Sequence, residues 1–101
     1  MSREASLVEP AVLITIIGES VLKESIIQML KSFDISGYTL NQVQGEGSHG
    51  KRMGDISGYN TNIEIKTIVP KEVSDEIFTI LKEHKGQHAF IAFRQQVEAL
   101  Q

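Results

Sequence analysis

The sequence predicts a single α+β domain of the ferredoxin-like type, βαββαβ with one antiparallel sheet. Three observations predict it. Segments of strand and helix character alternate in that order, a glycine-rich stretch separates the two halves, and 101 residues suffice for one domain only. Two right-handed crossovers would place both helices on one face of the sheet. We expect residues 1–10 to form a flexible N-terminal arm and residues 11–101 to form the domain.

The first half of the chain predicts strand, helix and strand. The β-branched run 11–17 stops at Gly18 and is typical of a buried strand. Apolar residues then recur at helical spacing over 22–33, with Ser20 as the expected N-cap. A second strand is expected over 38–44, where the alternation of apolar and polar residues is less regular.

The second half repeats the pattern. Residues 62–69 alternate with period two and predict a strand. Pro70 opens a helix that carries acidic residues early and basic residues late, an order that complements the helix dipole, and Gly86 ends it. The last strand is expected over 88–97.

Both sides of the first strand are apolar. Val12, Ile14 and Ile16 point one way, whereas Leu13 and Ile17 point the other way. Two helices shield only one face of a sheet, so the other face needs a different cover. The pattern therefore predicts that the protein oligomerises, although it does not give the number of subunits.

Composition and charge exclude several classes of protein. The formal net charge of −3 argues against nucleic acid as the main partner, and the lack of cysteine excludes disulfides and thiolate chemistry. Residues 1–10 lack the apolar run of a signal peptide, and the stretch 11–17 is far shorter than the roughly 20 residues that span a bilayer. We expect a cytoplasmic protein that does not insert directly into membranes.

The segment 45–52, Gly-Glu-Gly-Ser-His-Gly-Lys-Arg, matches two nucleotide-binding patterns in part. As G-x-G-x-x-G it would follow the first strand of a dinucleotide fold and open a helix, but here it follows the second strand and residues 53–60 do not predict a helix. As a P-loop it has Arg52 where magnesium binding needs Ser or Thr. Neither fold is predicted.

The glycine-rich segment still has the chemistry of an anion site. Successive glycines allow several backbone N–H groups to approach one anion, and Lys51 and Arg52 add two positive charges. A solvated loop without a ligand is equally compatible with these residues.

Four segments resemble the PII superfamily, and most closely its PII-like branch of small regulators associated with bicarbonate transporters and carboxysomes. The resemblance extends over about residues 11–100. The segments that carry it are Gly37-Tyr38-Thr39, Gly45-x-Gly47-Ser48, Asn62-Ile-Glu-Ile65 and the helix that follows Pro70.

The resemblance implies a non-enzymatic homotrimer in which the uncovered sheet faces pack around the threefold axis. Adenine nucleotides would bind in clefts between subunits, at the base of a mobile T-loop formed by residues 45–61. Gly37 and Thr39 would lie beside the adenine, and His49 and Tyr59 in the loop that meets the regulated partner, a membrane transporter being one candidate. The ligand-binding residues nearer the sugar and phosphates would be Gly45, Gly47, Ser48, Lys51, Arg52 and Gly86.

Three departures from the family pattern affect the expected ligand. The loop before the last strand shrinks to 85–87, the basic residues that follow that strand are absent, and His49 replaces a glutamine that helps hold magnesium. A ligand with less phosphate charge is therefore favoured. We expect AMP, ADP or cyclic AMP as the effector rather than ATP, with bicarbonate as an additional candidate, and no cofactor.

The remaining polar residues do not predict catalysis. His49, His84 and His88 lack the spacing of a metal site, and no nucleophile-base arrangement is present. Arg94 interrupts the last strand, where it either reaches a ligand or pairs with a carboxylate such as Glu64. Two alternatives stay open, namely an oligomeric scaffold without a small ligand and a metal-binding trimer of the CutA kind.

Overall fold

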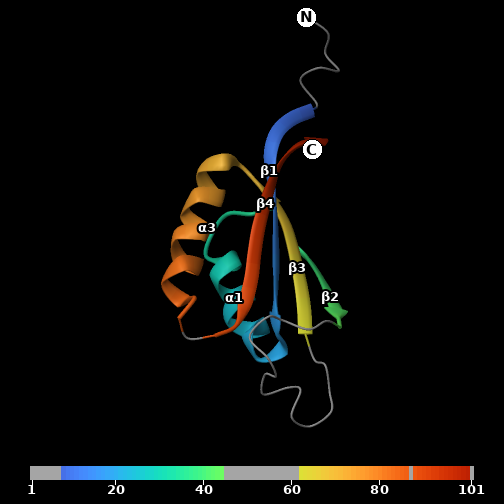
Figure 1. The fold of residues 1–101 in the computed structure, drawn as a ribbon. Coiled ribbons are helices and arrows are strands. Elements are labelled where there is room, and N and C mark those ends of the chain that lie inside the picture. Colours follow the sequence, from blue (N-terminus) through green and yellow to red (C-terminus); the bar gives the residue numbers. More distant parts are fainter. Residues whose placement is uncertain (1–7, 45–61, 87, 101) are drawn as a thin grey trace, which may run out of the picture.

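The computed structural model describes residues 8–44, 62–86 and 88–100. These residues form an antiparallel sheet with the strand order β2-β3-β1-β4 and two helices (Figure 1). The βαββαβ order and the antiparallel sheet are therefore confirmed. The elements are β1 (Val8–Glu19), the 3-10 turn η2 (Ser20–Leu22), α1 (Lys23–Lys31), β2 (Thr39–Val43), β3 (Asn62–Val69), α3 (Lys71–His84) and β4 (Phe90–Leu100).

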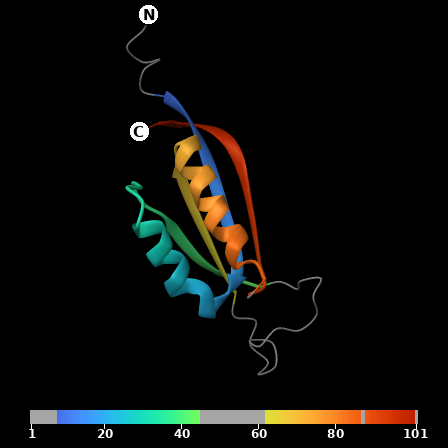
Figure 2. The same cartoon turned by 90° about the vertical axis from the view of Figure 1, so that its left-hand side faces the viewer.

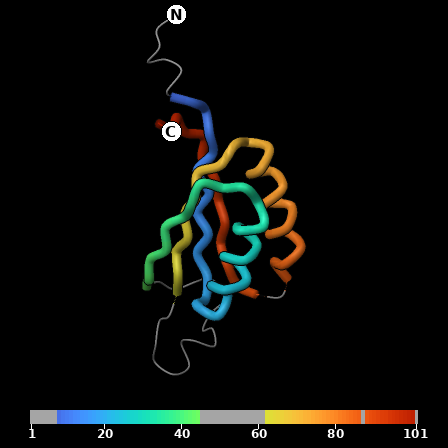
Figure 3. The backbone as a smooth tube through the Cα atoms, turned by 180° about the vertical axis from the view of Figure 1, so that it is seen from behind, coloured from blue at the N-terminus to red at the C-terminus, as the bar shows by residue number. Residues whose placement is uncertain are grey.

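Both helices lie on the same face of the sheet. Figure 2 shows α1 and α3 in front of the strands, and the view from behind in Figure 3 again places both helices on one side. No described element covers the opposite face. Neither described helix has the length and apolar character needed to cross a bilayer.

The core lies between the helices and the central strand β1, which pairs with both β3 and β4. Ile14 and Ile16 of β1 are fully buried, because their side chains point toward the helices. Leu30 of α1 and Ile77 of α3 belong to the same hydrophobic core and are also fully buried. The apolar alternation of β1 thus becomes one buried face, as the sequence predicts.

Strands β1 and β4 extend further than the apolar pattern. β1 begins at Val8, so the last three residues of the expected N-terminal arm pair with the end of β4, with Val8 opposite Leu100. β4 in turn begins at Phe90 rather than at residue 88 and continues to Leu100. Backbone pairing accounts for the extension, because two strands that run on together satisfy each other's N–H and C=O groups whatever their side chains.

The first helix begins differently from the prediction. Ser20 is the first residue of η2 instead of an N-cap, and its Oγ is buried without a hydrogen-bond partner in the described residues. Leu22 precedes α1 and provides no side-chain cap. The chain turns from β1 directly into helical geometry at Ser20, so this residue lacks the extended backbone that an N-cap requires.

Candidate functional site

The uncovered face of the sheet carries several apolar side chains, with the polar residues Thr15, Glu64 and Lys66 among them. Leu13 of β1 pairs with Ile68 of β3, and Ile17 of β1 pairs with Ile91 of β4. Phe93 of β4 pairs with Thr15, which lies between Leu13 and Ile17 on β1. Ile68, Ile91 and Phe93 are 41%, 58% and 45% exposed. The predicted second apolar face is therefore present.

A hollow of about 390 Å³ lies at the edge of this face and contains two of the predicted site residues. Gly37 and Thr39 form one wall, where the connection after α1 enters β2. Leu13 and Ile68 of the uncovered face contribute apolar surface to the same hollow. The hollow borders the uncovered face of the sheet, and we call it the Gly37 half-site.

A buried hydroxyl fixes the backbone at this hollow. Thr67 is 3% exposed, and its Oγ1 donates a 2.6 Å hydrogen bond to the carbonyl oxygen of Gly37. Gly37 has φ of +156°, a conformation in which a side chain would be strained. Thr39 then begins β2 opposite Lys66 of β3. The α1–β2 connection is thereby held against β3, and glycine is required at residue 37.

Gly86 lies at a different place from this hollow. It occupies the turn after α3, and neighbouring Lys85 donates a 3.3 Å hydrogen bond from Nζ to the carbonyl oxygen of Phe90. Gly18 pairs with Phe90, and the next residue of β1 pairs with Asn62. Gly86 is thus at the end of the sheet where β2 ends and β3 begins (Figure 1).

The other predicted ligand and partner residues lie outside the described part of the chain. They are Gly45, Gly47, Ser48, His49, Lys51, Arg52 and Tyr59.

Arg94 pairs with a carboxylate that the sequence did not single out. Its Nη1 lies 2.7 Å from Oδ1 of Asp75 and 2.7 Å from Oγ of Ser74, and the guanidinium lies 4.8 Å from the centre of the Phe78 ring. The suggested pairing with Glu64 is wrong. Arg94 lies opposite Ile14 and faces the helices, whereas Glu64 lies on the uncovered side.

Hydrogen bonds from Arg94 and, second, from Lys71 hold the pKa of the Asp75 carboxyl below its ordinary value. The signal that could have found this pair is the alternation of β4, in which Arg94 has the same phase as Phe90 and Ala92. This phase directs Arg94 toward α3, the helix that carries Asp75.

His84 and His88 line a small cavity between α1 and α3, together with apolar residues of both helices. His84 already uses Nδ1 in a 2.9 Å hydrogen bond with the carbonyl oxygen of Ile80. Within the described residues, no three histidine or carboxylate side chains are arranged to hold a metal ion.

The strand order and the two helices on one face define an α+β protein of the ferredoxin-like class. The family model for nitrogen regulatory protein P-II matches residues 11–101. The chain therefore belongs to the P-II family, which confirms the resemblance noted in the sequence. No curated protein sequence matches the chain.

Solved structures agree with this assignment. A PII-like signalling protein from Thermus thermophilus is 32% identical, with a TM-score of 0.75, and the match covers 92% of this chain and 91% of that protein. CPII from Thiomonas intermedia K12, a nitrogen regulatory PII-like protein bound to ADP, AMP and bicarbonate, is 25% identical with a TM-score of 0.78, over 91% and 97% of the two chains.

Proposed function

We propose that this chain is a sensor of AMP, ADP or cyclic AMP that binds the nucleotide between the subunits of a homotrimer. The observation that carries the proposal is the half-site at Gly37 and Thr39. Two of its lining residues, Leu13 and Ile68, belong to the uncovered apolar face. A subunit packed on that face would turn the open hollow into a closed cleft.

The trimer is proposed from the exposed apolar surface of the sheet. Burial of the exposed Ile91 and Phe93 side chains would stabilise the assembly by a free energy of roughly 25 cal/mol for each Å² of apolar area removed from water. Packing three copies of this face around one axis would bury it in all of them at once. A chain of this size also gains stability from association, because a small domain buries a limited share of its own surface.

The proposed ligand contacts follow from the chemistry of the half-site. Apolar Leu13 and Ile68 suit the flat face of an adenine base, and the backbone at Gly37 and the hydroxyl of Thr39 supply polar groups for its edge. The sugar and phosphates would extend toward the other end of the sheet. There we propose contacts from Gly45, Gly47, Ser48, Lys51, Arg52 and Gly86.

The short connection between α3 and β4 supports a ligand with few phosphates. α3 ends at His84 and β4 begins at Phe90, so the connection contains only one lysine and one glycine. Fewer N–H donors and cations are then available for an outer phosphate. CPII, bound to ADP, AMP and bicarbonate, supports both the nucleotide class and bicarbonate as an additional ligand.

We further propose that the protein is regulatory and acts in the cytoplasm. Residues 45–61 would serve as the T-loop, change conformation when the nucleotide binds, and present His49 and Tyr59 to a partner such as a membrane transporter. Such a switch requires that the nucleotide bind one conformation more tightly than the other.

Thermal unfolding with AMP, ADP, cyclic AMP, ATP, bicarbonate and divalent metals tests the proposal. A nucleotide present at 100 times its dissociation constant should stabilise the protein by about 2.7 kcal/mol. Arg52→Ala should weaken the effect, whereas Lys31→Ala, on the exposed surface of α1, should leave it unchanged. An unfolding temperature that no nucleotide changes would favour the scaffold alternative. An unfolding temperature that only divalent metals raise would favour the CutA-like alternative.

A further inference from the structure

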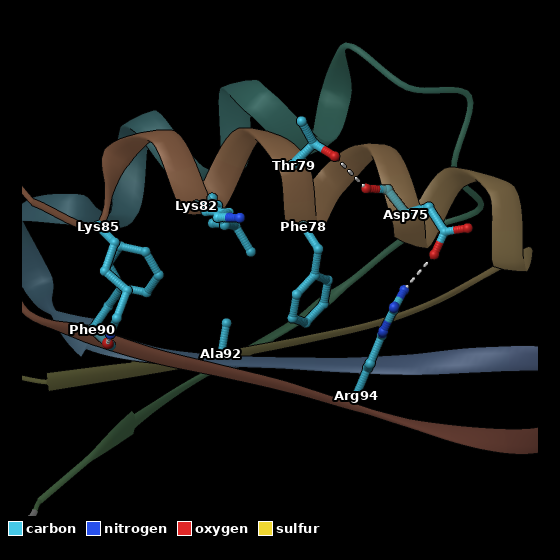
Figure 4. Close-up of a pocket in the computed structure, with 9 residues that line it drawn as sticks. Asp75, Phe78, Thr79, Lys82, Lys85, Phe90, Ala92 and Arg94 are labelled. Carbon is cyan, nitrogen blue, oxygen red and sulfur yellow. Dashed lines mark hydrogen bonds and ion pairs between the residues drawn. The ribbon is translucent and has the colours of Figure 1, made fainter.

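A second groove lies on the helix-covered side of the sheet, between α3 and the edge strand β4 (Figure 4). Its volume is about 510 Å³, within the range of roughly 300–1,000 Å³ that is typical of small-molecule sites. None of its lining residues belongs to the Gly37 half-site. The proposed function does not use this groove.

The floor of the groove is formed by β4 residues that alternate toward the helix. Ala92 lies between Phe90 and Arg94 in this alternation, and Phe78 descends from α3 on the Arg94 side (Figure 4). Because the alanine side chain is small, an apolar slot remains above it between the two phenyl rings. A flat apolar group would fit this slot.

Arg94 provides a fixed cation at one end of the slot. Its Nη1 donates to Ser74 and to Asp75, both at 2.7 Å, and Ser74 is fully buried. Nε and Nη2 have no hydrogen-bond partner within the described residues, so three of the five N–H donors of the guanidinium are available. A side chain already held in place loses little conformational entropy when it binds a ligand.

Two lysines make the groove positive as a whole. Lys82 and Lys85 lie toward its other end, with Nζ of Lys85 at 5.4 Å from the centre of the Phe90 ring. The lining thus contains three cationic side chains and one carboxylate, Asp75, a net charge of +2. The whole chain has a formal net charge of −3, so this groove is a local exception. The local positive charge of the groove favours the binding of an anion.

We propose that the α3–β4 groove is a second ligand site, which binds a small amphiphilic anion. A carboxylate or phosphate of the ligand accepts hydrogen bonds from Arg94, and its flat apolar part lies over Ala92 between Phe78 and Phe90, toward the end of the groove that carries Lys82 and Lys85. Guanidinium groups bind both oxyanions through paired N–H donors, so the shared chemistry is an oxyanion attached to an apolar group.

Phenyl phosphate is a suitable probe, and ¹⁵N-labelled full-length protein provides the readout. Titration should shift the amide signals of Thr79, Ala92 and Arg94 and leave those of Gly37 and Thr39 in place. ADP should produce the opposite pattern, so failure of one site is distinguishable from failure of the other. Inorganic phosphate and benzyl alcohol, each with half of the probe's chemistry, should bind at least about tenfold more weakly. Benzoate distinguishes a carboxylate from a phosphate site.

Two variants separate the slot from the cation. Arg94→Gln should reduce the affinity for phenyl phosphate by about tenfold or more, because a charge-assisted hydrogen bond is lost. Ala92→Leu keeps Arg94 and fills the slot, so it should abolish binding of phenyl phosphate. This second variant tests the proposal if Arg94→Gln does not fold. Lys31→Gln, a cation of the other helix, is the matched control. Unchanged affinity in Ala92→Leu, or equal binding of phosphate and phenyl phosphate, would overturn the proposal.

Discussion

The Arg94 guanidinium of β4 lies 2.7 Å from the Asp75 carboxylate of α3. Within the described residues, the side-chain hydrogen bonds that join α3 to β4 are both made by Arg94, to Asp75 and to Ser74. The other oxygen of Asp75 accepts a 3.1 Å hydrogen bond from Lys71 one turn earlier. A single carboxylate thus joins the start of α3 to the middle of an edge strand.

This pair makes part of the stability depend on pH. The pKa of Asp75 is lowered in the folded protein from an ordinary value of 3.8, chiefly by Arg94 and then by Lys71. A lowered carboxyl pKa contributes stability that is complete above the unfolded value and is lost as pH falls through the folded value. Because Asp75 is half exposed, the contribution is small.

Urea unfolding of Asp75→Asn should therefore show a weaker loss of stability than the wild type as pH falls below about 4. Arg94→Met should flatten the pH dependence more than Lys71→Met, because Arg94 is the larger cause of the shift. Identical pH profiles for Arg94→Met and the wild type would contradict this assignment.

Much of the fold could be predicted from the sequence because its signals are local. Alternation along β1 and the helical spacing of α1 and α3 identify the elements, and their order limits the topology to few choices. The strand ends were less predictable. Val8 and Leu100 pair with each other through the backbone, a contact that apolar patterning does not record.

The site was only partly predictable. Gly37 and Thr39 were predicted through the family resemblance, and the structure places both at one hollow. Their role in ligand binding stays a prediction. The Arg94–Asp75 pair spans 19 residues and depends on the register of β4 and on the helix above it. Glu64 and Asp75 are both carboxylates, and only the three-dimensional arrangement shows that they lie on opposite sides of the sheet.

Gly18 is predicted to tolerate no side chain. A Cβ at this position would lie 2.9 Å from Cβ of Phe90 and 3.1 Å from Cδ1 of Leu22, and the first of these atoms is not the end of a flexible chain. Gly18→Ala should reduce the free energy of unfolding by about 1–3 kcal/mol, as overpacking does. Gly86→Ala is the matched control, since nothing lies within 4 Å of its Cβ. Equal stability of the two variants in urea would refute the steric argument.

The hydrogen bond from Thr67 to Gly37 should matter for both stability and ligand binding. Thr67→Val keeps the shape of the side chain but leaves the Gly37 carbonyl oxygen without this donor, at a cost of about 0.5–1.5 kcal/mol because water can reach the exposed Gly37. The α1–β2 connection should then loosen and nucleotide affinity should fall, as calorimetric titration with ADP would show.

Thr79→Val provides the comparison for this substitution. Its Oγ1 also donates to a carbonyl, that of Asp75 at 3.0 Å, but on the exposed surface of α3. The variant should change neither stability by more than about 0.5 kcal/mol nor ADP binding. A Thr67→Val protein that binds ADP like the wild type would separate Gly37 from the nucleotide site.

The last prediction concerns the uncovered face of the sheet, which we propose to be the trimer interface. Phe93 is 45% exposed and lies among the apolar residues that we propose to form the trimer interface. Phe93→Asp would place a charge in that interface, where burying it without a partner costs several kcal/mol. Light scattering after gel filtration should give three times the 11.2 kDa chain mass for the wild type and a lower mass for the variant.

The control for the interface is Val21→Asp, which places the same charge at a 76% exposed apolar residue of η2, away from the uncovered face. This variant should remain trimeric. Far-ultraviolet circular dichroism verifies that each variant is folded before its mass is compared. The proposed cleft needs a second subunit against Leu13 and Ile68, so Phe93→Asp should lose ADP binding together with the trimer. A wild-type monomer that still binds ADP would show that one chain completes the site alone.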